Sequence, residues 1–341
     1  MPSLYQAVGG STRVLLAAAQ ALSRKHEVTV RGPFPEAASR HEHAVSSAQA
    51  EGLLAQLRLL PQLAKAIILE WRWVRANPAD VIYVHDEISL YAYGLIGRLL
   101  SIPVIWHVHM LDRAGWRQKI RHRLARAAIY ISAHSKQGEF SGPWRLIHNP
   151  VELPPLHRAG QPDLTRLCVI GAITPRKNQR LAVDVLAWLR ARGFRHELHF
   201  YGPEIDAGYA ASLRGEISAR GLAPQAHFHG MRNAAAIYAQ AGVVLLTSTY
   251  ENQPLVMLEA LGHGVPFVSV DLPACREIAA ASGFPLAQLQ PAEPARLGQA
   301  IVELDHLAQK GCAAAVRLHF SAAQFESKVL QFFGESVTLT K

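Results

Sequence analysis

The sequence has little of what marks membrane-spanning, secreted or cysteine-rich metal proteins. No apolar run approaches the ~18–20 residues of a membrane-spanning helix, and the first ten residues, MPSLYQAVGG, lack the basic, apolar and small-residue pattern of a signal peptide. The three cysteines (Cys168, Cys275 and Cys312) are odd in number and far apart, which excludes a disulfide framework and a cysteine-rich zinc site. Gly and Pro, 24 and 20 of 341 residues, are too few for a collagen-like or low-complexity chain. A cytoplasmic globular protein is expected.

The basic excess of the chain lies in its first half. Residues 1–150 carry 18 Lys and Arg against 10 Asp and Glu, whereas residues 151–341 carry 17 against 16, so the first half holds nearly all of the net charge of +9. Such an excess predicts an anionic partner for that half, and an acidic membrane surface or a phosphorylated substrate would fit. Nucleic acid is not expected as a partner, because no nucleic-acid recognition motif accompanies the charge.

Both halves alternate short β-branched or aromatic runs with longer helical patterns. Strands are expected at 81–84, 103–108, 128–132, 166–171, 197–202, 227–230, 243–248 and 266–270, and helices at 51–76, 179–193, 207–220 and 254–262. Alternation of this kind predicts parallel sheets covered by helices on both faces. The fold class is therefore α/β, with two Rossmann-like domains facing each other across a cleft. The polar, proline-rich segment 145–155 is the expected linker, which gives domains at 1–150 and 151–320 and a final helical segment at 321–341.

The segment from Glu251 to Glu259 follows a predicted strand and opens a predicted helix. Pro254 suits the first helical position, with Asn252 or Gln253 as the cap and with Gly262 or Gly264 ending the helix. The free amides of Leu255 and Val256 would then offer an anion site for a phosphate. Paired carboxylates at the carboxyl edge of a sheet can accept hydrogen bonds from sugar hydroxyls. Without that context, the segment is only a capped helix with two solvated glutamates.

An ordered set of motifs resembles the family 4 retaining glycosyltransferases, which have the GT-B fold. E-N-Q-P-L-V-M-L-E-A-L-G-H-G-V-P, which begins at Glu251, is similar to the E-x7-E signature of the family. The other segments that resemble the family occur in its order, at 9–30, 77–86, 102–110, 169–179 and 227–231. The resemblance implies a hexosyltransferase-type enzyme that uses a nucleotide sugar, with UDP-sugars favoured. It also implies that 321–333 crosses back to the first domain.

The resemblance assigns roles to residues of the second half. Glu251 lies near the donor sugar as a catalytic group, Glu259 binds the ribose hydroxyls, and Lys177 contacts the donor phosphates. The family usually has an arginine directly after the glycine of this strand, whereas Ala172 follows Gly171 here, so one phosphate contact is missing and Arg176 is the candidate substitute. Gly230 and Met231 fall where the backbone of the family passes the nucleobase.

The first half supplies two further assignments. His109 stands six residues after Pro103, the spacing of a family active-site histidine that contacts the donor sugar, and His107 lies on the same face of the predicted strand. Gly9 and Gly10 would let a loop pass close to the pyrophosphate and the acceptor. Only eight residues precede Gly9, so the family strand before this loop is either the shortened segment SLYQAV or is missing.

The expected reaction needs no metal and no cofactor. The sequence contains no Asp-x-Asp, the motif with which many other sugar transferases hold a metal on the diphosphate, so cations and helix amides must neutralise the leaving group. The acceptor is expected to be a glycan or a lipid-linked molecule of cell-envelope or polysaccharide synthesis. A catalytically silent GT-B binding or scaffold protein is the alternative. A Rossmann oxidoreductase fits less well, because GGSTRV does not supply G-x-G-x-x-G.

A basic segment, 113–126, suggests where an anionic partner binds. It holds six cations and no acidic residue, and Trp116, Ile120 and Leu124 recur at helical spacing among the cations. This pattern predicts either a helix on an anionic bilayer, which would make the protein peripheral on the inner face of the membrane, or a domain helix packed by its apolar stripe.

Overall fold

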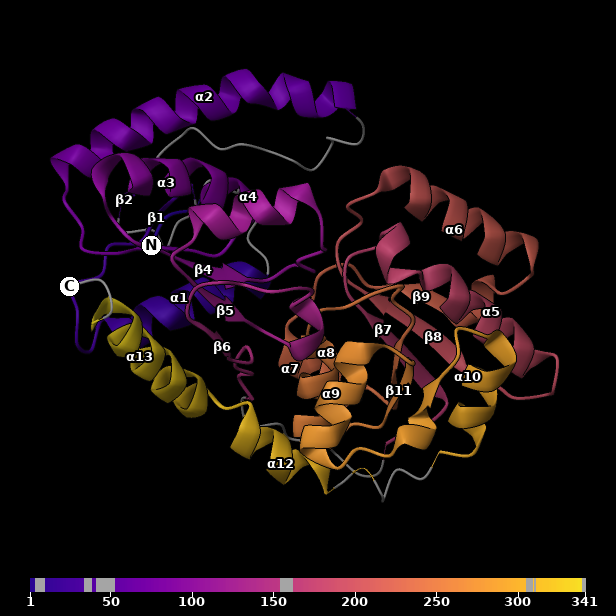
Figure 1. Ribbon diagram of the computed structural model, residues 1–341. Helices are drawn as coiled ribbons and strands as arrows, with labels where there is room; N and C mark the ends of the chain where they lie inside the picture. The colour runs from indigo at the N-terminus through magenta and orange to yellow at the C-terminus, as the bar shows by residue number, and fades with distance from the viewer. Residues whose placement is uncertain are drawn as a thin grey trace. The chain divides into compact units, whose positions relative to one another are not determined.

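The computed structural model describes residues 1–3, 10–33, 39–40, 53–153, 162–304, 309 and 311–338. The chain divides into two compact units (Figure 1). One unit consists of Met1–Pro150 together with Ala322–Lys341, and the other consists of Val151–Ser321. The chain therefore leaves the first unit after Pro150 and returns to it after Ser321.

The first unit is built on a parallel sheet. Its strands, in the order β3-β4-β5-β6, are β3 (Ile82–Val84), β4 (Val104–Val108), β5 (Ala127–Tyr130) and β6 (Trp144–Leu146). A short parallel pair consists of β1 (Arg31–Gly32) and β2 (Ser39–Arg40). The helices are α1 (Gly10–Leu22), α2 (Leu53–Ala76), α3 (Glu87–Leu100), α4 (Trp116–Leu124) and α13 (Ala322–Thr338).

Helices cover both faces of this sheet because its strands are apolar on both sides. Along β4, Trp106 faces the apolar cluster that includes residues of α2 and α3, whereas Ile105 faces the cluster of α1 and α13. The last helix, α13, packs beside α1 and contributes Phe325, Val329 and Phe332 to that second cluster (Figure 1).

Helix α4 does not pack through Trp116 and Ile120, as the alternative of a domain helix packed by its apolar stripe would require. Trp116 and Ile120 are 68% and 39% exposed, and the buried side chains of α4 are those of Gln118 and Arg121. The Arg121 guanidinium donates to Asp112 Oδ1 at 2.8 Å and to Glu87 Oε1 at 2.9 Å. Because Asp112 is fully buried, its charge draws Arg121 inward and turns Trp116 and Ile120 toward solvent.

The second unit is also a parallel sheet with helices on both faces. Its strands, in the order β12-β11-β10-β7-β8-β9, are β12 (Leu289–Gln290), β11 (Phe267–Val270), β10 (Val243–Leu246), β7 (Arg166–Ile170), β8 (Glu197–Tyr201) and β9 (Ala226–Phe228). Its helices are α5 (Gln179–Arg190), α6 (Ala207–Ala219), α7 (Ala234–Gln240), α8 (Leu255–Gly262), α9 (Pro273–Ser282), α10 (Pro294–Val302) and α12 (Cys312–His319). Short 3-10 turns lie at η1 (Ala133–Ser135), η2 (Pro175–Lys177), η3 (Ala223–Gln225) and η4 (Leu286–Gln288).

Every strand and helix expected above has a counterpart within a few residues, which confirms the α/β fold class. The parallel order of both sheets places the loops after β3, β4, β7 and β10 at carboxyl edges, where α/β proteins bind ligands. Within the described residues, no helix is long and apolar enough to cross a membrane.

Candidate functional site

Glu251 is the centre of a charged network at the carboxyl edge of the second unit. Lys177 Nζ donates to Glu251 Oε1 at 2.6 Å, Ser248 Oγ donates to the same oxygen at 2.8 Å, and an Arg176 guanidinium nitrogen donates to Oε2 at 3.2 Å. Glu251 is only 9% exposed. Burial raises the pKa of its carboxyl group, but the charges of Lys177 and Arg176 and the hydrogen bonds from Lys177 and Ser248 outweigh burial and lower the pKa below its usual value. Glu251 is therefore ionised at neutral pH.

The loop that carries the two cations is fixed by the neighbouring strand end. Thr247 Oγ1 donates to the carbonyl of Lys177 at 3.0 Å, and the amide of Thr249 donates to the carbonyl of Arg176 at 2.9 Å. Gly171, at φ +146°, lets the Lys177 side chain pass close to the backbone, because a Cβ at this position would lie 3.2 Å from Lys177 Cε. The structure thus brings the predicted residues Lys177, Arg176 and Glu251 together.

Glu259 is held from a different helix. Tyr238 of α7 donates its hydroxyl to Glu259 Oε2 at 2.7 Å, and Glu259 itself is half-buried in the second turn of α8. Burial and the Glu259 carboxylate raise the pKa of Tyr238 well above its usual value, so its hydroxyl stays protonated and remains a donor. The carboxylate is oriented before any ligand binds.

The start of α8 differs from the expectation. Pro254 is not the first helical residue: it is the N-cap, in extended conformation, and its carbonyl accepts the amide of Met257 at 3.0 Å. Neither Asn252 nor Gln253 caps the helix, because the fixed φ of proline and its extended ψ start the helix one residue later. Leu255 and Val256 still form the first turn, where helix amides can meet an anion. The helix ends at Gly262, one of the two expected glycines.

The remaining residues of this unit that the sequence singled out follow β7 and β9. Ala172 accepts a hydrogen bond on its carbonyl from Gln179 Nε2 at 2.9 Å, and its methyl side chain offers no donor. Gly230 adopts φ +63° and its carbonyl accepts the amide of Gly202 at 2.9 Å. Met231 follows with 74% of its surface exposed. A nucleobase contact by Gly230 and Met231 stays a prediction.

In the first unit, histidines gather where β3 and β4 end. The rings of His107 and His109 lie 4.3 Å apart between centroids, and those of His85 and His109 lie 6.2 Å apart. Burial lowers the pKa of His107 to about 3, and burial with the neighbouring histidines lowers the pKa of His109 well below its usual value. His107 Nδ1 is 2.6 Å from the hydroxyl of Tyr83, which makes it a core residue. His109, which is partly exposed, is a neutral imidazole at the sheet edge.

Of the two glycines predicted near the pyrophosphate, the structure describes only Gly10. Gly9 lies outside the described residues, as does 4–8, the segment in question as a shortened strand. Gly10 is the first residue of α1. Ahead of that segment, Pro2 pairs with Arg31 in a parallel bridge.

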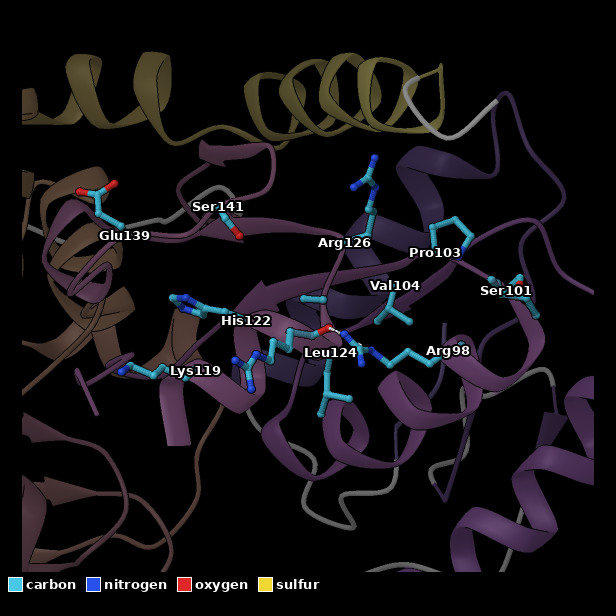
Figure 2. Close-up of a pocket in the computed structure, with 14 residues that line it drawn as sticks. Arg98, Ser101, Pro103, Val104, Lys119, His122, Leu124, Arg126, Glu139 and Ser141 are labelled. Carbon is cyan, nitrogen blue, oxygen red and sulfur yellow. Dashed lines mark hydrogen bonds between the residues drawn. The ribbon is translucent and has the colours of Figure 1, made fainter. Parts of the chain in front are cut away.

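A basic pocket of about 770 Å³ lies at the opposite, amino edge of the first unit's sheet (Figure 2). Its lining includes Arg98, Lys119, Arg123 and Arg126, all exposed, and the acid Glu139. The Arg98 guanidinium donates to the carbonyl of Arg123 at 2.8 Å, which joins α3 to the end of α4. The pocket is suited to an anion. Lys119, Arg123 and Arg126 belong to the basic segment 113–126, whereas no sequence pattern indicated Arg98.

Sequence reasoning missed three residues that shape the second unit's site. Thr247 and Ser248 directly follow β10 and could have been suspected as polar residues at a carboxyl edge. Tyr238 lies on α7, 21 positions from Glu259, and no local pattern signals its contact.

Two family models match the chain. The description Glycosyltransferase Family 4 matches residues 8–153, and Glycosyl transferases group 1 matches residues 165–306. No curated protein matches the chain.

Solved structures resemble the chain over nearly its whole length. HepE of Anabaena, determined in complex with UDP and glucose, is 18% identical with a TM-score of 0.75, and the match covers 98% of each chain. Sucrose-phosphate synthase from Thermosynechococcus elongatus is 17% identical with a TM-score of 0.70, covering 97% of this chain and 94% of that one. The lipopolysaccharide outer core galactosyltransferase WaaB is 15% identical with a TM-score of 0.65, covering 100% and 98%. These likenesses confirm the GT-B fold.

Proposed function

Because the chain is a glycosyltransferase that carries a Glycosyltransferase Family 4 domain ahead of a Glycosyl transferases group 1 domain, we propose that it moves a hexose from a UDP-sugar to a glycan or lipid-linked acceptor. Support for UDP comes from HepE, whose structures contain UDP with glucose and UDP-glucose. Support for an envelope or polysaccharide acceptor comes from WaaB, a lipopolysaccharide galactosyltransferase.

The observation that carries the proposal is the pair of cations fixed on Glu251. Lys177 and Arg176 occupy one loop at the carboxyl edge of β7, and their carbonyls are tied to the end of β10. A diphosphate bound there would meet two positive charges already in place, together with the amides at the start of α8. Preorganised charge of this kind lowers the barrier because it needs no rearrangement as the leaving group gains charge.

The proposed reaction retains the anomeric configuration and uses no metal or cofactor. The bond between the sugar C1 and the phosphate oxygen breaks, and its electron pair stays on the phosphate oxygen. The acceptor hydroxyl oxygen bonds to C1 from the same face, and its proton passes to the phosphate oxygen. Glu251 orients the sugar and stabilises the positive charge that develops on it, Lys177 and Arg176 stabilise the leaving diphosphate, and Glu259 holds the ribose. The role of His109 beside the sugar is part of the same proposal.

A panel of nucleotide sugars tests this function. Purified protein should be stabilised against heat by UDP-sugars and should release UDP from one of them, faster when an acceptor is supplied. Lys177→Ala should reduce both responses, whereas Arg296→Ala, a change at an exposed arginine of the same unit, should not. Binding without any UDP release would favour the silent scaffold protein, and the absence of both responses would overturn the proposal.

The proposal includes attachment of the first unit to an anionic membrane surface through residues 113–126. Trp116 and Ile120 are exposed apolar side chains on α4, and Arg117, Lys119 and Arg123 are exposed around them. Each cation near an anionic surface contributes about 1 kcal/mol, and an exposed tryptophan suits the interface. Arg121 takes no part in this surface, because it is buried against Asp112.

A further inference from the structure

We propose that Glu197, His199 and His227 form a binding site for a divalent transition-metal ion, with zinc as the best-suited ion. The three side chains lie on the last two strands of the second unit's sheet, β8 and the edge strand β9. Glu197 and His199 are two residues apart on β8 and therefore share a face, and His227 is the register partner of His199 on β9. The pairing of the strands thus places all three side chains together.

The distances suit a tetrahedral ion with little movement. Glu197 Oε2 is 3.3 Å from His199 Nε2 and 3.7 Å from His227 Nε2, and the three ligand atoms lie within 4.8 Å of one another. Zinc–ligand bonds of ~2.1 Å at tetrahedral angles place ligand atoms about 3.4 Å apart. One pair already has this separation. The side chains of Glu197 and His227 are 53% and 38% exposed, and the His227 ring stacks on the His199 ring at 4.8 Å between centroids. Small rotations of these two exposed side chains would bring the other ligand atoms to the same separation.

His199 is prepared as a ligand. Its side chain is only 5% exposed, so packing fixes the ring and leaves Nε2 facing Glu197. Its Nδ1 lies 2.9 Å from Nε2 of His229, whose ring stacks on Tyr201. With Nε2 bound to the ion, Nδ1 of His199 carries the ring proton and donates a hydrogen bond to Nε2 of His229. Metal-bound histidines are commonly oriented by such a hydrogen bond from their second nitrogen.

The donor set and position indicate what the site does. Two imidazoles and one carboxylate favour zinc over magnesium or calcium, which prefer oxygen ligands, and the exposed side leaves room for a water as fourth ligand. Glu197 and His199 lie four and two residues before Tyr201, which ends β8, so the site lies roughly 7–13 Å along the strand from the carboxyl edge that holds Lys177 and Glu251. An ion there would tie the edge strand to its neighbour and stabilise the sheet without touching the diphosphate.

Zinc alone, titrated into the chelator-stripped full chain in a non-coordinating buffer, tests the site. The wild type should bind one equivalent by calorimetry, and its melting temperature should rise with zinc but not with magnesium. His227→Ala and Glu197→Gln should each weaken zinc binding by more than about 100-fold, since even loss of a supporting hydrogen bond costs about 10–100-fold. His229→Phe, which keeps the stacked ring, should fall within that smaller range.

His319→Ala, a change at an exposed histidine outside the cluster, should bind zinc as the wild type does. Absence of saturable binding to the wild type, or binding that survives both His227→Ala and Glu197→Gln, would show that these side chains form only ion pairs and stacked rings. The assay uses neither donor nor acceptor, so its outcome is independent of the transfer reaction.

Discussion

Replacing Glu259 with alanine should weaken donor binding much more than it slows the bound reaction. Glu259 Oε2 accepts the Tyr238 hydroxyl at 2.7 Å, which orients the carboxylate in the second turn of α8. A ribose hydrogen bond to this carboxylate would be made in the ground state and in the transition state alike, so its loss raises KM and leaves kcat nearly unchanged.

The size of the effect follows from the charge of Glu259. A hydrogen bond to a charged group contributes roughly 1.5–3 kcal/mol, which corresponds to about 10- to 150-fold in affinity. Tyr238→Phe leaves the carboxylate in place and removes only its orienting partner, so this variant should lose about 1 kcal/mol, or roughly fivefold. The expected order of donor affinity is therefore wild type, Tyr238→Phe, then Glu259→Ala.

Calorimetric titration with UDP and with the preferred UDP-sugar measures these affinities, and steady-state kinetics separates kcat from KM. Glu303→Ala, at an exposed glutamate of the same unit, should match the wild type. An unchanged affinity in Glu259→Ala would remove Glu259 from the donor site. A kcat that falls as far as kcat/KM would instead assign it to the transition state.

Three further outcomes are expected. Lys177→Met should raise the pKa of Glu251 toward its usual value, because one of the charges that lower it is lost. The stability that ionised Glu251 contributes above its usual pKa then becomes smaller and is lost at a higher pH as acid is added, so the midpoint of acid unfolding should move upward; an unmoved midpoint would contradict the ion pair. EDTA should leave transfer intact even where it removes zinc and lowers the melting temperature, and loss of transfer restored by Mg²⁺ or Mn²⁺ would refute the metal-free mechanism. Wild-type protein should sediment with anionic vesicles at low salt and be released as salt rises. Replacing Arg117, Lys119 and Arg123 with Glu should abolish sedimentation but not donor binding. Failure of the wild type to sediment would exclude binding of α4 to an anionic membrane surface.

The sequence by itself determined the order of the elements and the location of the donor-side residues. Alternating apolar runs fixed the strands, because a strand buried on both faces must be apolar throughout, as Val104–Val108 is apart from His107. The spacing of Glu251 and Glu259 placed both on one strand–loop–helix unit, where local rules of capping and periodicity apply. Those rules erred by one residue at Pro254, because proline fixes φ but not ψ, and the extended ψ of Pro254 starts the helix at Leu255.

Only the tertiary structure decided contacts between residues far apart in the chain. Arg121 looked like one of six equivalent cations, yet the buried charge of Asp112 and the carboxylate of Glu87 hold it inward and leave Trp116 in solvent. Tyr238 reaches Glu259 from another helix. His199 and His227 become neighbours through the register of β8 and β9. Local patterns report periodicity and caps, whereas partners of this kind are set by which strands pair and by how helices pack on them.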